Sequence, residues 1–205
     1  MTQNKRYAVT GGIGSGKSVF CELLKKRGYP VFSCDEISAL LWQDPEYRDG
    51  LSALFPEYTV RGEIVKSKLS EAVFLNESAL NKLNTYSHAK IMARLFALTE
   101  QTKISFCEVP LLFENGLEAR FDGVIVLTRD QESRIRSVAE RSNLTRQEVL
   151  ARIKTQFDYS RLPKTQNYKC VVVQNDGSRE DLDHKLSAVL SEMGLALYNT
   201  GSKIV

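Results

Sequence analysis

Residues 11–18 read Gly-Gly-Ile-Gly-Ser-Gly-Lys-Ser, and they fit the pattern G-x-x-x-x-G-K-[ST] at every position. Glycine lets a loop backbone adopt positive φ angles and approach an anion without a clash from a Cβ atom. The N–H groups of such a loop converge on phosphate oxygens at the positive end of the helix that follows. In this pattern Lys17 reaches the β- and γ-phosphates of a nucleotide, and the Ser18 hydroxyl ligates Mg²⁺. The sequence therefore predicts a P-loop with these nucleotide contacts: Gly11, Gly12, Ile13, Gly14, Ser15, Gly16, Lys17, Ser18 and Val19.

The segments on either side of the loop predict an α/β fold. A short apolar run at Tyr7–Val9 reads as a strand, and a helix runs from Lys17 to Arg27 with Gly28 as its stop. Strand, helix and strand in this spacing form a βαβ unit, so the sheet should be largely parallel. Buried parallel strands are continuous apolar runs. We therefore expect a three-layer α/β/α core with a mostly parallel five-stranded sheet, its remaining strands being Val31-Phe32, Ile104–Val109, Val124–Leu127 and Cys170–Val173.

The stretch from Asp35 to about Thr99 is predicted to be mostly helical, with a turn at Gly62. It holds too many helical residues for one crossover, so we interpret it as an inserted helical region. Two helices are expected after Leu127, and the second opens with a Ser/Thr-x-x-Glu capping box at Thr145. The last predicted helix spans Asp181–Met193.

The composition is ordinary for a globular protein, with 42% hydrophobic residues and a net charge of +3. That balance is too mild to indicate nucleic-acid binding. No apolar stretch approaches 18 residues and no N-terminal signal is visible, so we expect a cytoplasmic protein without a membrane span. The four cysteines form no C-x-x-C pair, which argues against a zinc site, and Cys107 and Cys170 fall in predicted buried strands.

The basic residues are concentrated between Arg129 and Lys169, a segment that contains ten Lys or Arg but only five Asp or Glu. A solvated helix face is one explanation of such a run. The other is a cover over a polyanion such as the phosphates of a nucleotide.

Three acids are placed at or after predicted strand ends. Asp35 follows the second strand, where it could accept the proton of an attacking hydroxyl, hold a water on Mg²⁺, or cap a helix over Glu36–Gln43. Glu108 ends the third strand and could join a magnesium shell through water. Glu114 lies in the loop that follows, beyond Pro110. Glu108 and Glu114, each taken alone, are also compatible with a plain surface position.

Taken together, these segments resemble dephospho-CoA kinase, from about Arg6 to Leu190. Thr10–Ser18 is similar to that family's T-G-G-I-G-S-G-K-S, and Pro110–Leu117 to its P-L-L-F-E-x-G-L, which is more diagnostic than a generic P-loop. Asp35 matches the last acid of the D-A-D segment, and His88 followed by Ile91 resembles H-P-x-I. Further matches in the lid and last-strand segments are Arg141, Gln156, Asn175 and Gly177. The chain departs from the family pattern at Ser33, Ala39, Ser70, Ala89, Arg134, Ser137, Ser142 and Lys169-Cys170.

The resemblance implies that ATP donates its γ-phosphoryl group to the ribose 3′-hydroxyl of dephospho-CoA. It implies catalytic roles for Asp35 as base, for Lys17 and for Arg141, and it adds Arg141 and Asn175 to the ATP contacts. Ser18 and Glu108 would hold Mg²⁺. The implied acceptor contacts are Asp35, His88, Pro110, Leu111, Leu112, Phe113 and Glu114.

The resemblance also implies a division of the chain. Residues 1–34, 100–133 and 168–193 would form the nucleotide-binding core, 35–99 the acceptor-binding region, 134–167 a lid, and 194–205 a tail. The expected state is a monomer or weak homo-oligomer. Two alternatives stay open: a related small-metabolite or nucleoside kinase with another hydroxyl acceptor, and a non-catalytic nucleotide-binding regulator. A GTPase is disfavoured because the sequence has no N-K-x-D segment.

Overall fold

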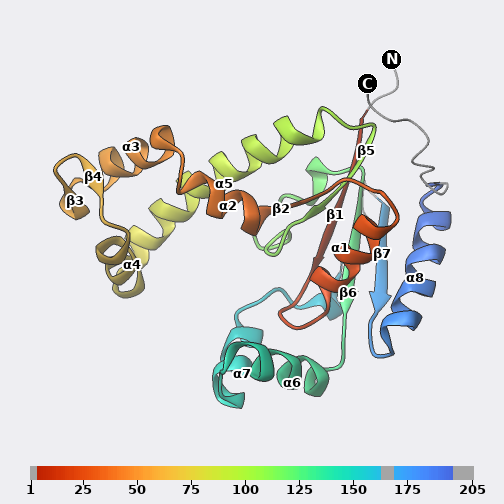
Figure 1. Ribbon diagram of the computed structural model, residues 1–205. Coiled ribbons are helices and arrows are strands. Elements are labelled where there is room, and N and C mark those ends of the chain that lie inside the picture. Colours follow the sequence, from red (N-terminus) through yellow and green to blue (C-terminus); the bar gives the residue numbers. More distant parts are fainter. Residues whose placement is uncertain (1–3, 163–168, 196–205) are drawn as a thin grey trace. The chain divides into compact units, whose positions relative to one another are not determined.

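The computed structural model describes residues 4–162 and 169–195 of the chain (Figure 1). The chain divides into two compact units, one of residues 1–32 with 102–205, and one of residues 33–101. Residues 163–167 of the predicted lid and 196–205 of the predicted tail lie outside the described residues, as do 1–3 and 168 of the predicted core. None of the described helices combines the length and the apolar content that a bilayer span requires.

A five-stranded sheet with the order β2-β5-β1-β6-β7 forms the centre of the first unit. The pairs β1–β5, β1–β6 and β6–β7 are parallel, which confirms the predicted α/β fold with a mostly parallel sheet. The apolar runs of the sequence explain the pairing, because each central strand buries both of its faces. The five strands are β1 (Lys5–Gly11), β2 (Val31–Ser33), β5 (Ile104–Glu108), β6 (Gly123–Thr128) and β7 (Lys169–Gln174).

Two helices, α1 (Lys17–Lys26) and α8 (Arg179–Glu192), lie side by side on one face of the sheet (Figure 1). Their apolar side chains and alternate strand residues form one core, as the period of two along a strand requires. The side chains on the opposite face, such as Ala8, Cys107 and Val124, are also fully buried. The central members of the core are Tyr7, Val9, Phe20, Leu24, Phe106, Ile125, Leu127, Leu182 and Leu186.

The last strand, β7, lies at the edge of the sheet and alternates buried and exposed residues. Val172 is 52% exposed and Cys170 is only half-buried, so the prediction that Cys170 lies in a buried strand was wrong. The physical reason is position: an edge strand has a neighbour on one side only, and part of it meets solvent.

Helix ends in the first unit follow their capping residues. Gly28 has φ 82° directly after the C-cap of α1, which confirms the predicted stop. Thr145 caps α7 (Arg146–Lys154) through the predicted capping box with Glu148, and Ser178 caps α8 in the same way with Asp181. The remaining helical elements of the unit are α6 (Gln131–Ser142) and short 3₁₀ turns at Glu118–Arg120 and Tyr159–Arg161.

The second unit is mainly helical, as predicted, but it also contains a small antiparallel hairpin that the sequence analysis missed. Arg61 and Gly62 connect its strands with φ angles of 52° and 83°, as a type I′ turn requires. Strands of two residues carry too little alternation to be recognised from the sequence. The elements of the unit are α2 (Cys34–Leu41), α3 (Pro45–Leu54), a 3₁₀ turn (Pro56–Tyr58), β3 (Thr59–Val60), β4 (Glu63–Ile64), α4 (Lys66–Leu75) and α5 (Glu77–Thr99).

Helix α2 begins at Cys34, earlier than the start at Glu36 that was expected if Asp35 were its N-cap. Ser33 is the N-cap, and its side chain accepts a hydrogen bond from the Glu36 N–H at 3.5 Å. Asp35 therefore lies inside the first turn, and the interpretation of Asp35 as the N-cap was wrong. Ser33 and Asp35 are both good capping residues, and the helix starts at Cys34, two residues before the start that a cap at Asp35 requires. The carboxylate of Asp35 is left with the favourable charge interaction of a helix N-terminus.

Candidate active site

The loop between β1 and α1 has the backbone conformation of an anion-binding nest. Gly14 and Gly16 have φ angles of 76° and 95°, which only glycine adopts without strain. The Ser15 N–H donates to the Gly12 carbonyl at 3.2 Å and closes the turn. Among the described residues, the N–H groups of Gly14 and Gly16 have no hydrogen-bond partner. The loop thus keeps donors for an anion at the N-terminus of α1.

Lys17 lies over the loop it belongs to. Its Nζ atom donates to the carbonyl oxygens of Gly11 at 2.7 Å and Gly12 at 3.2 Å. The ammonium group therefore lies at the start of the same loop, beside Gly11 and Gly12. Val19, the last predicted nucleotide contact, packs its side chain partly against the core of the first unit.

Ser18 and Glu108, the two predicted metal ligands, meet in the structure. The Ser18 hydroxyl donates to Glu108 Oε1 at 3.2 Å. Hydroxyl and carboxylate oxygens are the hard groups that Mg²⁺ prefers, so the chemistry of this pair fits the ion. The contact exists because β5 is the parallel neighbour of β1, which brings the carboxyl ends of both strands to one edge.

Asn175 follows β7, and its side chain reaches the same loop. Its Nδ2 atom donates to the Ser15 carbonyl at 2.9 Å, and its backbone N–H donates to the Thr128 carbonyl at 2.8 Å. A Cβ atom at Gly16 would collide with the Asn175 side-chain amide, so this glycine is needed for a close approach. The structure therefore brings this predicted ATP contact to the P-loop.

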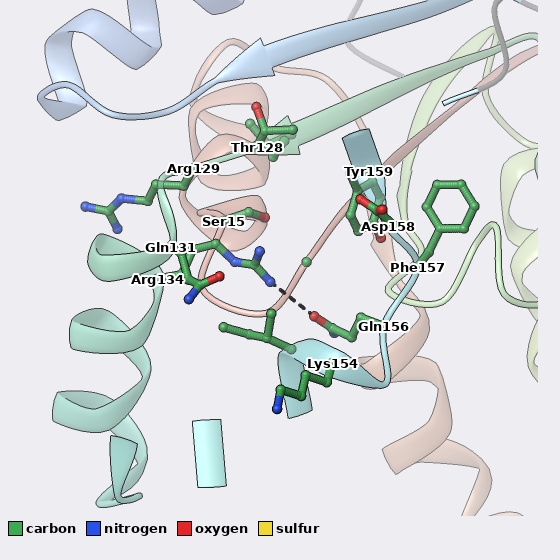
Figure 2. A pocket seen from close by; sticks show the side chains of 13 residues that line it. Ser15, Thr128, Arg129, Gln131, Arg134, Lys154, Gln156, Phe157, Asp158 and Tyr159 are labelled. Carbon is green, nitrogen blue, oxygen red and sulfur yellow. Dashed lines mark hydrogen bonds between the residues drawn. The ribbon is translucent and has the colours of Figure 1, made fainter. Parts of the chain in front are cut away.

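A cavity of about 550 Å³ lies beside the loop, between α6 and the segment that follows α7 (Figure 2). Three cations, Arg129, Arg134 and Lys154, contribute to its walls. Arg134 Nε donates to the Ile13 carbonyl at 2.9 Å, and Gln156 Oε1 accepts from the Ile13 N–H at 2.8 Å. The other lining residues are Gly12, Ser15, Leu127, Thr128, Gln131, Ile153, Phe157, Asp158 and Tyr159.

The P-L-L-F-E segment packs against the chain that follows α7. Phe113 and Phe157 stack with ring centroids 4.8 Å apart, and Glu114 Oε1 accepts a hydrogen bond from the Phe157 N–H at 2.8 Å. Leu112 is fully buried, so its side chain belongs to the core, whereas Leu111 is exposed and Pro110 half-buried. Of the predicted acceptor contacts here, Leu111, Phe113 and Glu114 present side chains outside the core.

Tyr159 completes this aromatic cluster. Its ring lies 5.3 Å from that of Phe157 and 6.1 Å from that of Phe113, both edge to face. Burial raises the pKa of Tyr159, and the nearby Glu114 carboxylate raises it further. The phenol is therefore neutral at physiological pH. Its hydroxyl lies near Thr10 and Gly11, where β1 enters the loop.

Three further predicted site residues do not line this cavity. Asp35 is exposed in the first turn of α2, and His88 is half-buried on α5; both belong to the second unit. Arg141 is exposed in the last turn of α6 and is not among the residues that line the cavity. The roles of these three residues stay predictions.

Four residues that contact the P-loop or its aromatic neighbours were missed as site residues: Arg134, Gln156, Phe157 and Tyr159. Arg134 was noted only as a departure from the family pattern, and Gln156 only as a match to it. The concentration of basic residues after Arg129 was the available signal, but it did not show which cation would reach the loop.

Comparison with known proteins identifies one family. The sequence model of the dephospho-CoA kinase family matches residues 7–181. A dephospho-CoA kinase from Thermus thermophilus is 37% identical over 189 residues, which cover 90% of this chain and 90% of that protein. The enzyme of the same name from Geobacillus kaustophilus is 33% identical over 192 residues, covering 90% of this chain and 94% of that protein.

Solved structures agree with this result. A crystal structure of a Thermus thermophilus protein superimposes with a TM-score of 0.77 at 36% identity, covering 93% of this chain and 98% of that one. Dephospho-CoA kinase from Campylobacter jejuni gives a TM-score of 0.65 at 26% identity over 93% and 98% of the two chains. The similarity thus extends through both units rather than to the P-loop alone.

Proposed function

The chain belongs to the dephospho-CoA kinase family, and from this premise we propose how its residues transfer the ATP γ-phosphoryl group to the ribose 3′-hydroxyl of dephospho-CoA. The products are CoA and ADP, as in the last step of coenzyme A biosynthesis. The observation that carries the proposal is the loop itself, in which the N–H groups of Gly14 and Gly16 have no partner in the described parts of the chain and Lys17 bonds the loop carbonyls. The N–H donors and the Lys17 ammonium group are complementary to the negative charge of a triphosphate.

Magnesium is the metal that the residues at this edge of the sheet fit. Ser18 Oγ and Glu108 Oε1 are hard oxygen groups of the kind that Mg²⁺ prefers, and they lie 3.2 Å apart. We propose that Ser18 contacts the ion directly and Glu108 through water. A bound Mg²⁺ ion would neutralise charge that develops on the phosphate oxygens.

Asp35 is the proposed base. In the transfer, the acceptor hydroxyl gives its proton to the Asp35 carboxylate, its oxygen forms a bond to the γ-phosphorus, and the bond from that phosphorus to the β–γ bridging oxygen breaks. Lys17 stabilises the negative charge that remains on the leaving ADP. Asp35 is suited to this task because it is exposed and is not engaged as the cap of α2.

We propose that the helical unit of residues 33–101 binds the acceptor. It contains a cavity of about 430 Å³ between α2 and α5, lined by Ile37, Leu40, Leu41, Gln43, Asp44, Arg94 and Leu98. Apolar walls with a few polar groups are typical of a pocket for a small organic molecule. His88, on α5 of the same unit, is a proposed acceptor contact.

The function is tested by measuring ADP release from ATP and Mg²⁺ with and without dephospho-CoA. We expect strong stimulation by dephospho-CoA, appearance of CoA in equal amount, and loss of turnover when Mg²⁺ is chelated. Stimulation by another hydroxyl compound alone would indicate a different small-metabolite kinase. Nucleotide binding without any stimulated release would indicate a regulator that has lost transfer activity.

We further propose that α6, α7 and the segment after them close over bound ATP, with Arg141 near the phosphates. Closure excludes the water that competes with the hydroxyl for the phosphoryl group. Arg146, Arg152, Lys154 and Arg161 are exposed, and they offer trypsin sites along this segment. We expect trypsin to cut there more slowly when ATP analogue and acceptor are both bound. Equal cutting rates with and without ligands would contradict closure.

Cytoplasmic location, a monomeric or weakly associating state, and the absence of nucleic-acid partners stay predictions. Size-exclusion chromatography with light scattering would measure the oligomeric state.

A further inference from the structure

Ile13, at the tip of the P-loop, is held through both of its peptide groups. Its carbonyl oxygen accepts from Arg134 Nε at 2.9 Å, and its N–H donates to Gln156 Oε1 at 2.8 Å. The two partners also meet each other, since Arg134 Nη2 donates to the same Gln156 oxygen at 3.4 Å (Figure 2). That oxygen therefore accepts from two donors, which fixes the orientation of the Gln156 amide. We call Arg134 and Gln156 the Ile13 clamp.

The side chain of Ile13 is anchored in the same place. It packs against a small apolar cluster formed by Ile135, Val138 and Val149 of α6 and α7. Gly12 and Gly14 are essential to this approach, because a Cβ at Gly12 would collide with the Arg134 guanidinium, and one at Gly14 would lie 2.9 Å from Val138 Cγ2. The P-loop tip thus packs against the helical hairpin, with the clamp on the polar side of this contact.

The bonds of the clamp act on different peptide units of the loop. The Ile13 carbonyl belongs to the peptide unit whose N–H is that of Gly14, one of the two N–H groups that have no partner among the described residues. A cation bonded to a carbonyl polarises the peptide and strengthens hydrogen bonding by its N–H. Burial lowers the pKa of Arg134, but a guanidinium remains charged in proteins. The N–H of Ile13 itself is occupied by Gln156 and is not available to an anion.

We propose that Arg134 and Gln156 are positioning residues for ATP: they fix the tip of the P-loop, and the Arg134 cation strengthens the Gly14 N–H as a phosphate donor. The inference rests on the proposed function, because it concerns the same nucleotide. It assigns a role to Arg134, a residue at which the chain departs from the family pattern. It also separates Arg134 from Arg141, which lies two turns later on α6 and does not line the cavity.

The test compares Arg134→Ala, Arg134→Lys, Gln156→Leu and the double variant Arg134→Ala with Gln156→Leu. Calorimetry gives the Kd for ATP, and steady-state kinetics give KM for each substrate. We expect Arg134→Ala and Gln156→Leu to weaken ATP binding by about 10- to 100-fold, as for the loss of a hydrogen bond to a charged group or of the partner of a buried one. The KM for dephospho-CoA should stay at its wild-type value, since the clamp acts through its hydrogen bonds to Ile13 of the P-loop.

Two further results are expected if the clamp acts as one unit. The double variant should lose less than the product of the two single losses, because both residues act through Ile13. Arg134→Lys should recover only part of the affinity, since lysine keeps the charge without the planar fork that spans Ile13 and Gln156. Arg136→Ala, at an exposed position on the same helix, is the matched control and should bind ATP normally.

Wild-type affinity for ATP in folded Arg134→Ala would overturn the proposal. So would equal losses for both substrates together with a lowered melting temperature, which indicate a purely structural role. Turnover of wild-type protein with dephospho-CoA is measured alongside. If that turnover is absent, the proposed function fails. The ATP affinities of the variants still test whether Arg134 and Gln156 position the loop.

Discussion

Replacing Lys17 by alanine is expected to lower turnover by about 10²–10³-fold or more, the range seen when one charge-stabilising donor is removed from an active site. Lys17 Nζ lies 2.7 Å from the Gly11 carbonyl and 3.2 Å from that of Gly12, so its positive charge is held at the P-loop. Without it, the charge that develops on the leaving ADP has no fixed positive partner in the loop. The kcat measured at saturating ATP and dephospho-CoA checks this.

Lys26→Ala is the control for that experiment. Lys26 is exposed in the last turn of the same helix, α1, and lies far along the chain from the loop. The control should keep wild-type turnover. A Lys17→Ala protein that is folded, as judged by its melting temperature, and that retains turnover within an order of magnitude of wild type would remove Lys17 from the mechanism.

Asp35→Asn is the second change with a large expected effect. We expect transfer to fall by about 10²–10⁴-fold, the usual contribution of a general base, while the Kd for ATP stays unchanged. The amide keeps the size and polarity of the side chain and cannot accept the hydroxyl proton. Calorimetry with ATP and a discontinuous assay for CoA separate the two quantities.

Glu36→Gln is the matched control for Asp35→Asn. Both residues are exposed acids in the first turn of α2, so both substitutions remove one favourable charge from the same helix end. Any loss of stability should therefore be similar, and only Asp35→Asn should stop transfer. Near-normal turnover in Asp35→Asn would leave Asp35 as a helix-stabilising acid and require another base.

Much of the fold could be predicted because its signals are local. The glycines and Lys17 marked the loop, and the apolar runs at 104–109 and 124–127 marked two buried strands. The start of α2 was misplaced because Ser33 and Asp35 are both able to cap, and only the backbone decides between them. The hairpin at Arg61-Gly62 was missed because its strands are two residues long.

The candidate site was predictable where a residue follows directly from the loop or from the end of a neighbouring strand. Glu108 and Asn175 are of this kind, and they reach Ser18 and the Ser15 carbonyl. Gln156 and Arg134 are not, because they reach the loop from across a helical hairpin, over sequence distances of more than one hundred residues. Nothing in the local pattern distinguishes Arg134 from the other arginines of α6.

The central position of β1 affects how the chain matures on the ribosome. Tyr7 pairs with Phe106 on one side and with Gly123 on the other, although β1 is the first strand to be synthesised. At about 5–20 residues per second, roughly 5–20 s separate the emergence of Tyr7 from that of its first partner. During that interval the apolar edge of β1 and the inner face of α1 have no sheet to cover them. These apolar residues of the nascent chain therefore stay uncovered until β5 leaves the exit tunnel.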